Sequence, residues 1–215
     1  MWASFAFVLG GLPLLAGAVQ VTYTSSSDSF QQNQSITSVV FDNGVTTIQG
    51  YAFYNCTKLG GDIDLSNTSV TQIESQAFSY TNIESVTFPV SLEWIGYGAF
   101  FTCANLRGHI DLSNTSVTQI ENQAFESTNI ESVTFPVSLK WIGSDVFLHC
   151  TNLSGHIDLS STNVTQIGTY AFSNTNIENV FFPALLEQIG ENAFYDCTNL
   201  GGDVDLSSTN VTQIG

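Results

Sequence analysis

The amino-acid sequence predicts a solenoid of stacked repeats with short parallel β-strands, because the same residue types recur at fixed intervals. One series of phenylalanines and one series of cysteines both recur every 47 residues. A second series of phenylalanines divides this interval into steps of 25 and 22 residues. A solenoid of such units displays a long regular surface, which favours binding over catalysis. The recurring residues are Phe53, Phe78, Phe100, Phe125, Phe147, Phe172 and Phe194, with Cys56, Cys103, Cys150 and Cys197.

The first 18 residues are expected to form a secretory signal peptide. An apolar stretch from Met1 to Leu15 is too short to span a bilayer and precedes the small residues Ala16-Gly17-Ala18. The mature protein would then begin near Val19. Residues 19–35 are rich in Ser, Gln and Thr and do not follow the repeat, so we expect them to form an N-terminal cap over the first apolar unit.

Residues 36–215 are expected to form the solenoid, in alternating 25- and 22-residue units of a size typical of leucine-rich repeats. In the longer unit, Ile63 and Leu65 alternate with Asp62 and Asp64, the period of a short strand with one buried face. The shorter units show the same alternation and then reach a proline, which ends the strand because it has no donor N–H. The strands are expected to form one sheet face.

The residues opposite the strands are expected to form 3₁₀ or short helical turns and loops. Val70, Ile73 and Phe78 face inward at spacings of three to five residues, which suits such turns. Stacking would bring the phenylalanines into one continuous spine. The chain stops at Ile214-Gly215 in the middle of a unit, so we expect the solenoid to be truncated at its C-terminus.

The four cysteines are expected to be buried and unpaired. They lie two units apart, which corresponds to about 10 Å or more between Cα atoms at about 4.8 Å for each rung. A disulfide requires a Cα separation of no more than about 7 Å. The intervening units carry Thr81, Thr128 and Thr175 at the same position.

The charge of the chain excludes several classes of partner. It contains 19 Asp or Glu and three Lys or Arg, a formal net charge of −16. Nucleic acid and anionic membrane surfaces would be repelled, since both are bound through Lys and Arg. No run after the signal peptide is long and apolar enough for membrane insertion. We therefore expect a protein or glycan ligand, with a cationic partner favoured by the charge.

The outward strand positions form the preferred candidate ligand surface. Two columns of polar side chains recur along the sheet, and only here does the repeat bring carboxylates and imidazoles onto one face. We expect the aspartates to attract a cationic patch on a partner. The candidate residues are Asp62, Asp64, His109, Asp111, Ser132, Thr134, His156, Asp158, Asp203 and Asp205.

Metal binding and hydrolysis are both disfavoured at this surface. Carboxylates on alternate rungs lie about 10 Å apart, too far to share a calcium ion. Ser132 lies one rung from His109 and His156, with Asp111 and Asp158 in the next column, so a catalytic triad has to be considered. An open sheet offers neither an oxyanion hole nor a pocket that excludes water. We expect no enzymatic activity, no metal and no cofactor.

Two further surface features follow from the sequence. Trp94 and Trp141 occupy equivalent positions that hold Thr47 and Gln188 in other units, so the indoles are expected to be partly exposed and to cover the core or to stack on a sugar or partner. Asn-x-Ser/Thr sequons predict glycosylation in a eukaryotic secreted protein, whereas these residues are otherwise good turn formers. The candidate acceptors are Asn33, Asn67, Asn114, Asn152, Asn163 and Asn210; Asn55 also lies in a sequon.

The pattern Ile-x-x-x-Ala-Phe-x-x-Cys-x-x-Leu, found from Ile48 to Leu59, resembles the BspA-type leucine-rich repeats of secreted and cell-surface proteins. The resemblance covers residues 36–215. Two departures are the threonines that replace alternate cysteines and a Leu-Ser-Asn-Thr run more like other leucine-rich repeat classes. Members of the family are typically adhesins or surface antigens. The resemblance therefore implies a secreted or surface-exposed protein that binds through its strand face; the alternatives are a structural coat or matrix solenoid and the ectodomain of a receptor.

Overall fold

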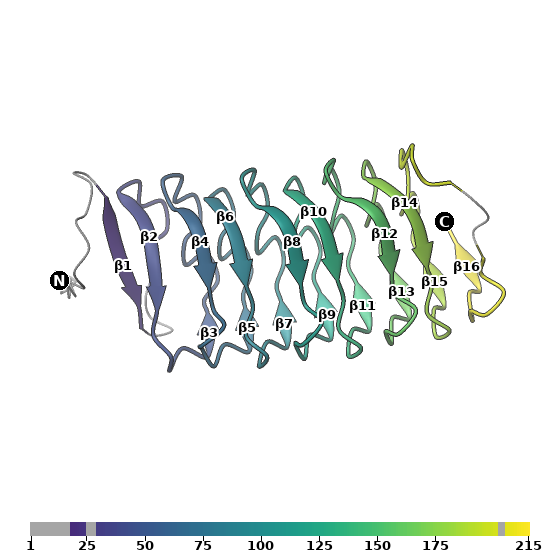
Figure 1. The fold of residues 1–215 in the computed structure, drawn as a ribbon, viewed down its shortest axis with the longest axis horizontal. Coiled ribbons are helices and arrows are strands. Elements are labelled where there is room, and N and C mark those ends of the chain that lie inside the picture. The colour runs from purple at the N-terminus through teal and green to yellow at the C-terminus, as the bar shows by residue number, and fades with distance from the viewer. Residues whose placement is uncertain (1–17, 25–28, 202–204) are drawn as a thin grey trace.

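The computed structural model describes residues 18–24, 29–201 and 205–215, and these form an elongated solenoid of parallel strands (Figure 1). Two rows of strands run side by side along its length. Residues 1–17, which contain most of the predicted signal peptide, lie outside the described part. Within that part, no helix has the length and apolarity needed to cross a membrane.

The longer strands form one row, and they pair two by two: β1 with β2, β4 with β6, β8 with β10, and β12 with β14. The expected single sheet is therefore divided into pairs. Within a pair, Asn82 reaches back and donates its side-chain amide to the Thr57 carbonyl at 2.6 Å. Gly61 makes a bulge at a φ of 74°. The bounds are β1 Val19–Tyr23, β2 Ile36–Phe41, β4 Gly60–Asp64, β6 Asn82–Thr87, β8 Arg107–Asp111, β10 Asn129–Thr134, β12 Ser154–Asp158 and β14 Asn176–Phe181.

The second row is a continuous eight-stranded sheet of two-residue strands. Turns and loops join these strands as expected, but they are not helical: no 3₁₀ or α-helix occurs among the described residues. The two-residue strands bond between rungs, as when Gly96 N donates to Ile73 O at 2.8 Å, and bonds such as Ala99 N to Gly96 O at 3.1 Å close the turns that follow them. The strands are β3 Thr47–Ile48, β5 Gln72–Ile73, β7 Trp94–Ile95, β9 Gln119–Ile120, β11 Trp141–Ile142, β13 Gln166–Ile167, β15 Gln188–Ile189 and β16 Gln213–Ile214.

A stack of phenylalanine rings occupies the centre of the core, as predicted. Neighbouring rings lie 5.2–5.7 Å apart between centroids, with interplanar angles of 20° or less. Six of the seven rings are fully buried, while Phe194 at the C-terminal end is partly buried. Most of the aliphatic residues predicted beneath the strands are buried; Val180 is partly buried, and Val204 lies outside the described residues. The continuous stack confirms the predicted register.

The cysteines are buried and unpaired, as predicted. Cys103 Sγ donates to the Phe78 carbonyl at 3.0 Å and lies 3.4 Å from Thr81 Oγ1 on the preceding rung. Cys and Thr therefore act as equivalent small hydrogen-bonding side chains in alternate units. Burial raises the pKa of the Cys103 and Cys150 thiols to about 11, so both remain protonated and poorly nucleophilic at neutral pH.

The region predicted to be a polar cap also contributes to the core. Val19–Tyr23 form strand β1, which pairs in parallel with β2. The Tyr23 ring is fully buried and lies 5.6 Å from Phe53, and Phe30 stacks on the same ring at 5.5 Å. Residues 19–35 therefore supply aromatic cover for the first ring of the stack.

Replacing Phe147 with Ala is expected to lower the free energy of unfolding by about 3–5 kcal/mol, because it removes a fully buried ring between two stacked neighbours. Phe181→Ala is the control, since this ring is 50% exposed and its loss should cost far less. Urea denaturation of both variants measures the difference. Equal costs would contradict a core organised around the stack.

Candidate functional site

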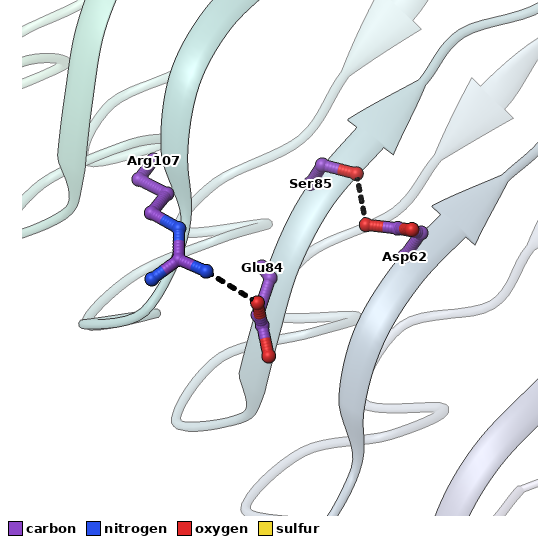
Figure 2. A network of polar contacts seen from close by, with 4 residues as sticks. All are labelled: Asp62, Glu84, Ser85 and Arg107. Atoms are coloured by element: carbon purple, nitrogen blue, oxygen red, sulfur yellow. Dashed lines mark hydrogen bonds and ion pairs between the residues drawn. The ribbon is translucent and has the colours of Figure 1, made fainter.

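The first outward column of the strand face consists of polar side chains that are bonded in pairs. Asp62 accepts a hydrogen bond from Ser85 Oγ at 2.6 Å, between β4 and β6 (Figure 2). The next pair of strands repeats the arrangement with a different acceptor, since His109 Nδ1 lies 2.8 Å from Ser132 Oγ. Between β12 and β14, the corresponding distance is 3.1 Å from His156 Nδ1 to the Asn179 amide. Each residue of the longer units is therefore oriented by the following strand.

The second column contains aspartates that also shape the turn after the strand of each longer unit. One carboxylate oxygen of Asp111 accepts the Ser113 backbone N–H at 2.9 Å, which is an Asx turn. The same bond at the same distance recurs at Asp64, Asp158 and Asp205. These side chains were predicted as ligand contacts, and the structure adds a role in the turn that the sequence prediction did not include.

The hydrogen bonds of the turn stabilise the charged form of these carboxylates. The Ser113 hydroxyl and backbone N–H hold the pKa of Asp111 below its ordinary value. The equivalent serines lower the pKa of Asp64 and Asp205. These three carboxylates therefore carry a full negative charge at neutral pH, and each retains free acceptor positions toward solvent.

Within the described residues, Ser132, His109 and Asp111 are not arranged as a Ser-His-Asp triad. Both ring nitrogens of His109 face hydroxyls, with Nε2 3.2 Å from Thr134 Oγ1 and Nδ1 beside Ser132. Asp111 is engaged by Ser113 rather than by the imidazole. Because the acid does not orient the imidazole, the relay that a triad requires is not present.

Potential metal ligands are equally dispersed. No group of three or more His, Cys, Asp or Glu gathers closely enough to hold a metal ion in the part of the chain that the structure describes.

A single ion pair crosses the boundary between two strand pairs. Arg107 at the start of β8 donates to Glu84 of β6 at 2.6 Å (Figure 2). It is the one salt bridge found in residues 18–24, 29–201 and 205–215. Both side chains are well exposed, so the pair contributes only about 0–1 kcal/mol to stability. It neutralises the basic residue of the strand face, which leaves that face acidic.

A hollow of about 200 Å³ lies between β6 and β8, at the boundary where the strand pairs meet. Its floor is apolar, formed by the largely buried Val86 and Phe88. His109 and Asp111 line one side, and Val90, which is 71% exposed, lines the other. Two of the predicted ligand residues thus border a concave site that combines apolar and acidic groups.

A larger hollow of about 470 Å³ lies at the C-terminal end of the solenoid. Phe181, Phe194 and Leu206 line it together with the predicted Asp205. Its lining includes Gly201 and Asp205, while the predicted ligand residue Asp203 lies outside the described residues. We therefore build the candidate site on the hollow between β6 and β8.

The candidate glycosylation residues differ in their surroundings. Asn33 is partly buried and accepts a hydrogen bond from Ser35 N at 2.9 Å, whereas the other five are exposed. Asn163 donates its amide to the Val137 carbonyl. Asn114 lines the hollow between β6 and β8, so a glycan on it would stand at the edge of the candidate site.

Sequence reasoning did not find an exposed aromatic ladder on the turns beyond the two-residue strands. Tyr51, Tyr54, Tyr80 and Phe101 make successive edge-to-face contacts, with centroids 5.3–5.7 Å apart. Tyr51 and Tyr80 have positive φ angles, of 61° and 60°. Aligning the turns unit by unit would have shown the aromatic residues, but not their contacts.

Comparison with known proteins gives a family and a fold. The family described as BspA type leucine rich repeat region matches residues 24–154 and 71–201, in six copies. The T. pallidum leucine rich repeat protein TpLRR is 23% identical with a TM-score of 0.58, over 86% of this chain and 78% of that one. The pneumococcal vaccine antigen PcpA is 21% identical with a TM-score of 0.58, over 89% of this chain and 64% of the antigen. A search of curated proteins found no match.

Replacing Asp111 with Ala is expected to lower the free energy of unfolding by about 0.5–1.5 kcal/mol, because the Ser113 N–H loses its acceptor. Asp111→Asn should preserve most of this stability, since an Asn carbonyl oxygen can accept the same bond. Urea denaturation at pH 7 measures both variants. An alanine variant as stable as the wild-type protein would mean that the hydrogen bond from Ser113 N–H to Asp111 does not stabilise the turn.

The pH dependence of the free energy of unfolding separates the effect of the Asp111 charge from the effect of its hydrogen bond in the turn. Because the folded-state pKa of Asp111 is lowered, its contribution is complete above the ordinary value of 3.8 and is lost as the pH falls through the lower folded-state value. The stability gap between the wild-type protein and Asp111→Asn should therefore shrink below about pH 4. A gap that stays constant down to pH 2 would contradict the lowered pKa.

Proposed function

This chain belongs to the BspA-type leucine-rich repeat family, and from this premise we propose that it is a secreted or cell-surface protein that binds a basic protein ligand through its strand face. The family match covers more than half of the chain. The proposal assigns no catalytic step to the chain and requires no cofactor.

The hollow between β6 and β8 is the observation that carries this proposal. A Lys or Arg side chain combines an apolar stem with a cationic head. The stem would pack against Val86, Phe88 and Val90, and the head would meet the Asp111 carboxylate. A volume of about 200 Å³ is suited to one long side chain rather than to a whole small-molecule ligand.

The charge distribution supports the same class of partner. The formal net charge is −16, and Arg107 on the strand face is already paired with Glu84. Glu131 and Glu178 follow Glu84 at equivalent exposed positions of β10 and β14. A basic partner would be steered toward this face, with an association rate that falls as salt rises.

Export from the cell is part of the proposal, and it depends on the segment from Met1 to Ala18. N-terminal sequencing of the exported protein should give Val19 as the first residue. Recovery of the product inside the cell with Met1 still present would contradict export.

The double variant Asp111→Asn, Asp158→Asn is expected to bind Lys- and Arg-rich peptides more slowly, because it removes two charges from the strand face while keeping acceptors for both turns. A peptide array first identifies a basic peptide that binds the wild-type protein. Stopped-flow experiments at two ionic strengths then measure the association rate of that peptide with each protein. The difference should be largest at low salt.

Glu93→Gln, Glu187→Gln is the matched control. It removes the same formal charge from two exposed residues that precede strands of the other sheet. The proposal requires the control to associate nearly as fast as the wild-type protein. Equal slowing in both double variants would point to net charge alone and would overturn a role for the strand face.

A further inference from the structure

The outward column of the two-residue strands is chemically different from the strand face. Its residues pair in register from β3 to β16, and none of them is charged. Indoles stand at two positions, and amides or a hydroxyl stand at the others. In spatial order, the column is Thr47, Gln72, Trp94, Gln119, Trp141, Gln166, Gln188 and Gln213. An uncharged stripe of this length on a chain of net charge −16 calls for an explanation.

The amides have a structural explanation, whereas the indoles do not. In-register Gln side chains can bond along a parallel stack, and Gln188 donates to Gln213 at 3.4 Å. A Gln at position 94 would stand in register with Gln72 and Gln119. Trp94 and Trp141 stand at two positions of a column that otherwise holds Gln and one Thr. The core beneath does not require them, because the neighbouring strands bury their isoleucines equally well beneath Gln.

The two indoles are held on the outer surface beside hydrogen-bonding groups. Each precedes a buried isoleucine in its strand and is itself partly exposed. The Trp94 indole N–H donates to Glu121 at 3.3 Å, which orients that ring toward the next rung. The hydrogen bonds found in the described residues include none from the Trp141 indole N–H, and its ring has polar side chains in register on both sides.

The spacing of the rings restricts the ligand that could use both. Trp94 and Trp141 both pair with Gln119, so they lie two rungs apart, about 10 Å along the solenoid axis. An extended β-1,4-linked polysaccharide turns successive pyranose rings over, so the same ring face recurs at every second sugar. The apolar face of a sugar stacks on an indole, and its hydroxyls bond to amides and carboxylates such as Gln119 and Glu121.

We propose that the column containing Trp94, Gln119 and Trp141 binds a neutral, extended β-linked polysaccharide, with one sugar ring on each indole. The occupant is neutral because the column offers no cation for an acidic glycan and the whole chain repels one. A peptide adding as a β-strand would require free backbone groups, but those of the inner strands are bonded to both neighbouring rungs. This site is separate from the strand face and does not depend on the function proposed for it.

Intrinsic fluorescence provides a direct test, because the chain contains only three tryptophans. In the exported protein that begins at Val19, or in the full chain with Trp2→Phe, all of the tryptophan emission comes from Trp94 and Trp141. Titration with cellohexaose, chitohexaose and xylohexaose is expected to shift the emission to shorter wavelength with at least one of these neutral probes. Trp94→Ala and Trp141→Ala should each weaken that binding about tenfold, as measured by calorimetry, since each loses one stacking ring.

The controls separate stacking from misfolding and from the strand face. Trp94→Phe should retain most of the affinity, because it keeps an aromatic face, and circular dichroism checks the fold of every variant. Phe181→Ala, which loses an exposed ring on the strand face, and Asp111→Asn, Asp158→Asn should bind the sugar as the wild-type protein does. The proposal is overturned if none of the three probes binds, if polygalacturonate binds in their place, or if folded alanine variants bind with unchanged affinity.

Discussion

The in-register stacking of identical positions on successive rungs is the constraint on which the rest of this structure depends. The ring of Phe125 meets Phe100 at 5.2 Å and Phe147 at 5.7 Å, nearly parallel to both. A shift by one residue in any unit would replace a ring by a side chain of a different shape and leave a cavity. Because the stack sets the register, every other position of the unit also forms a column. The surface columns therefore follow from packing inside the core.

The alternation of 25- and 22-residue units divides this regular surface into pairs of strands. A shorter unit follows each longer unit. The strand of the shorter unit pairs with the strand of the longer unit before it, as β6 with β4 and β10 with β8. The longer steps leave boundaries between pairs, such as the one between β6 and β8. There the hollow beside His109 and Asp111 opens, and there Arg107 reaches across to Glu84. A solenoid of equal units would offer the same residues on a more uniform surface.

The periodic spacing of the sequence was sufficient for the solenoid, the phenylalanine stack and the unpaired cysteines, because each depends only on what recurs at a fixed interval. It was not sufficient for the second sheet. The spacing from Val70 to Ile73 fits a helical turn and a two-residue strand equally well, and bonds between rungs decide between them. The role of Asp111 in the turn was missed for a related reason: an Asp two residues before Ser113 can face a ligand or accept the backbone N–H.

A residue that recurs in every unit thus needs two explanations before it is assigned to binding. Asp64, Asp111 and Asp158 recur because the strand of each longer unit ends in the same turn, so their repetition alone says little about a partner. Departures from the repeat are more informative, since the fold does not demand them. His109 and His156 occupy the position that Asp62 holds in β4, and they change the hydrogen-bonding character of the column while the pairing with the next strand persists. Selection for stacking alone would tolerate either residue, so differences of this kind along a column are where specificity for a ligand can be encoded.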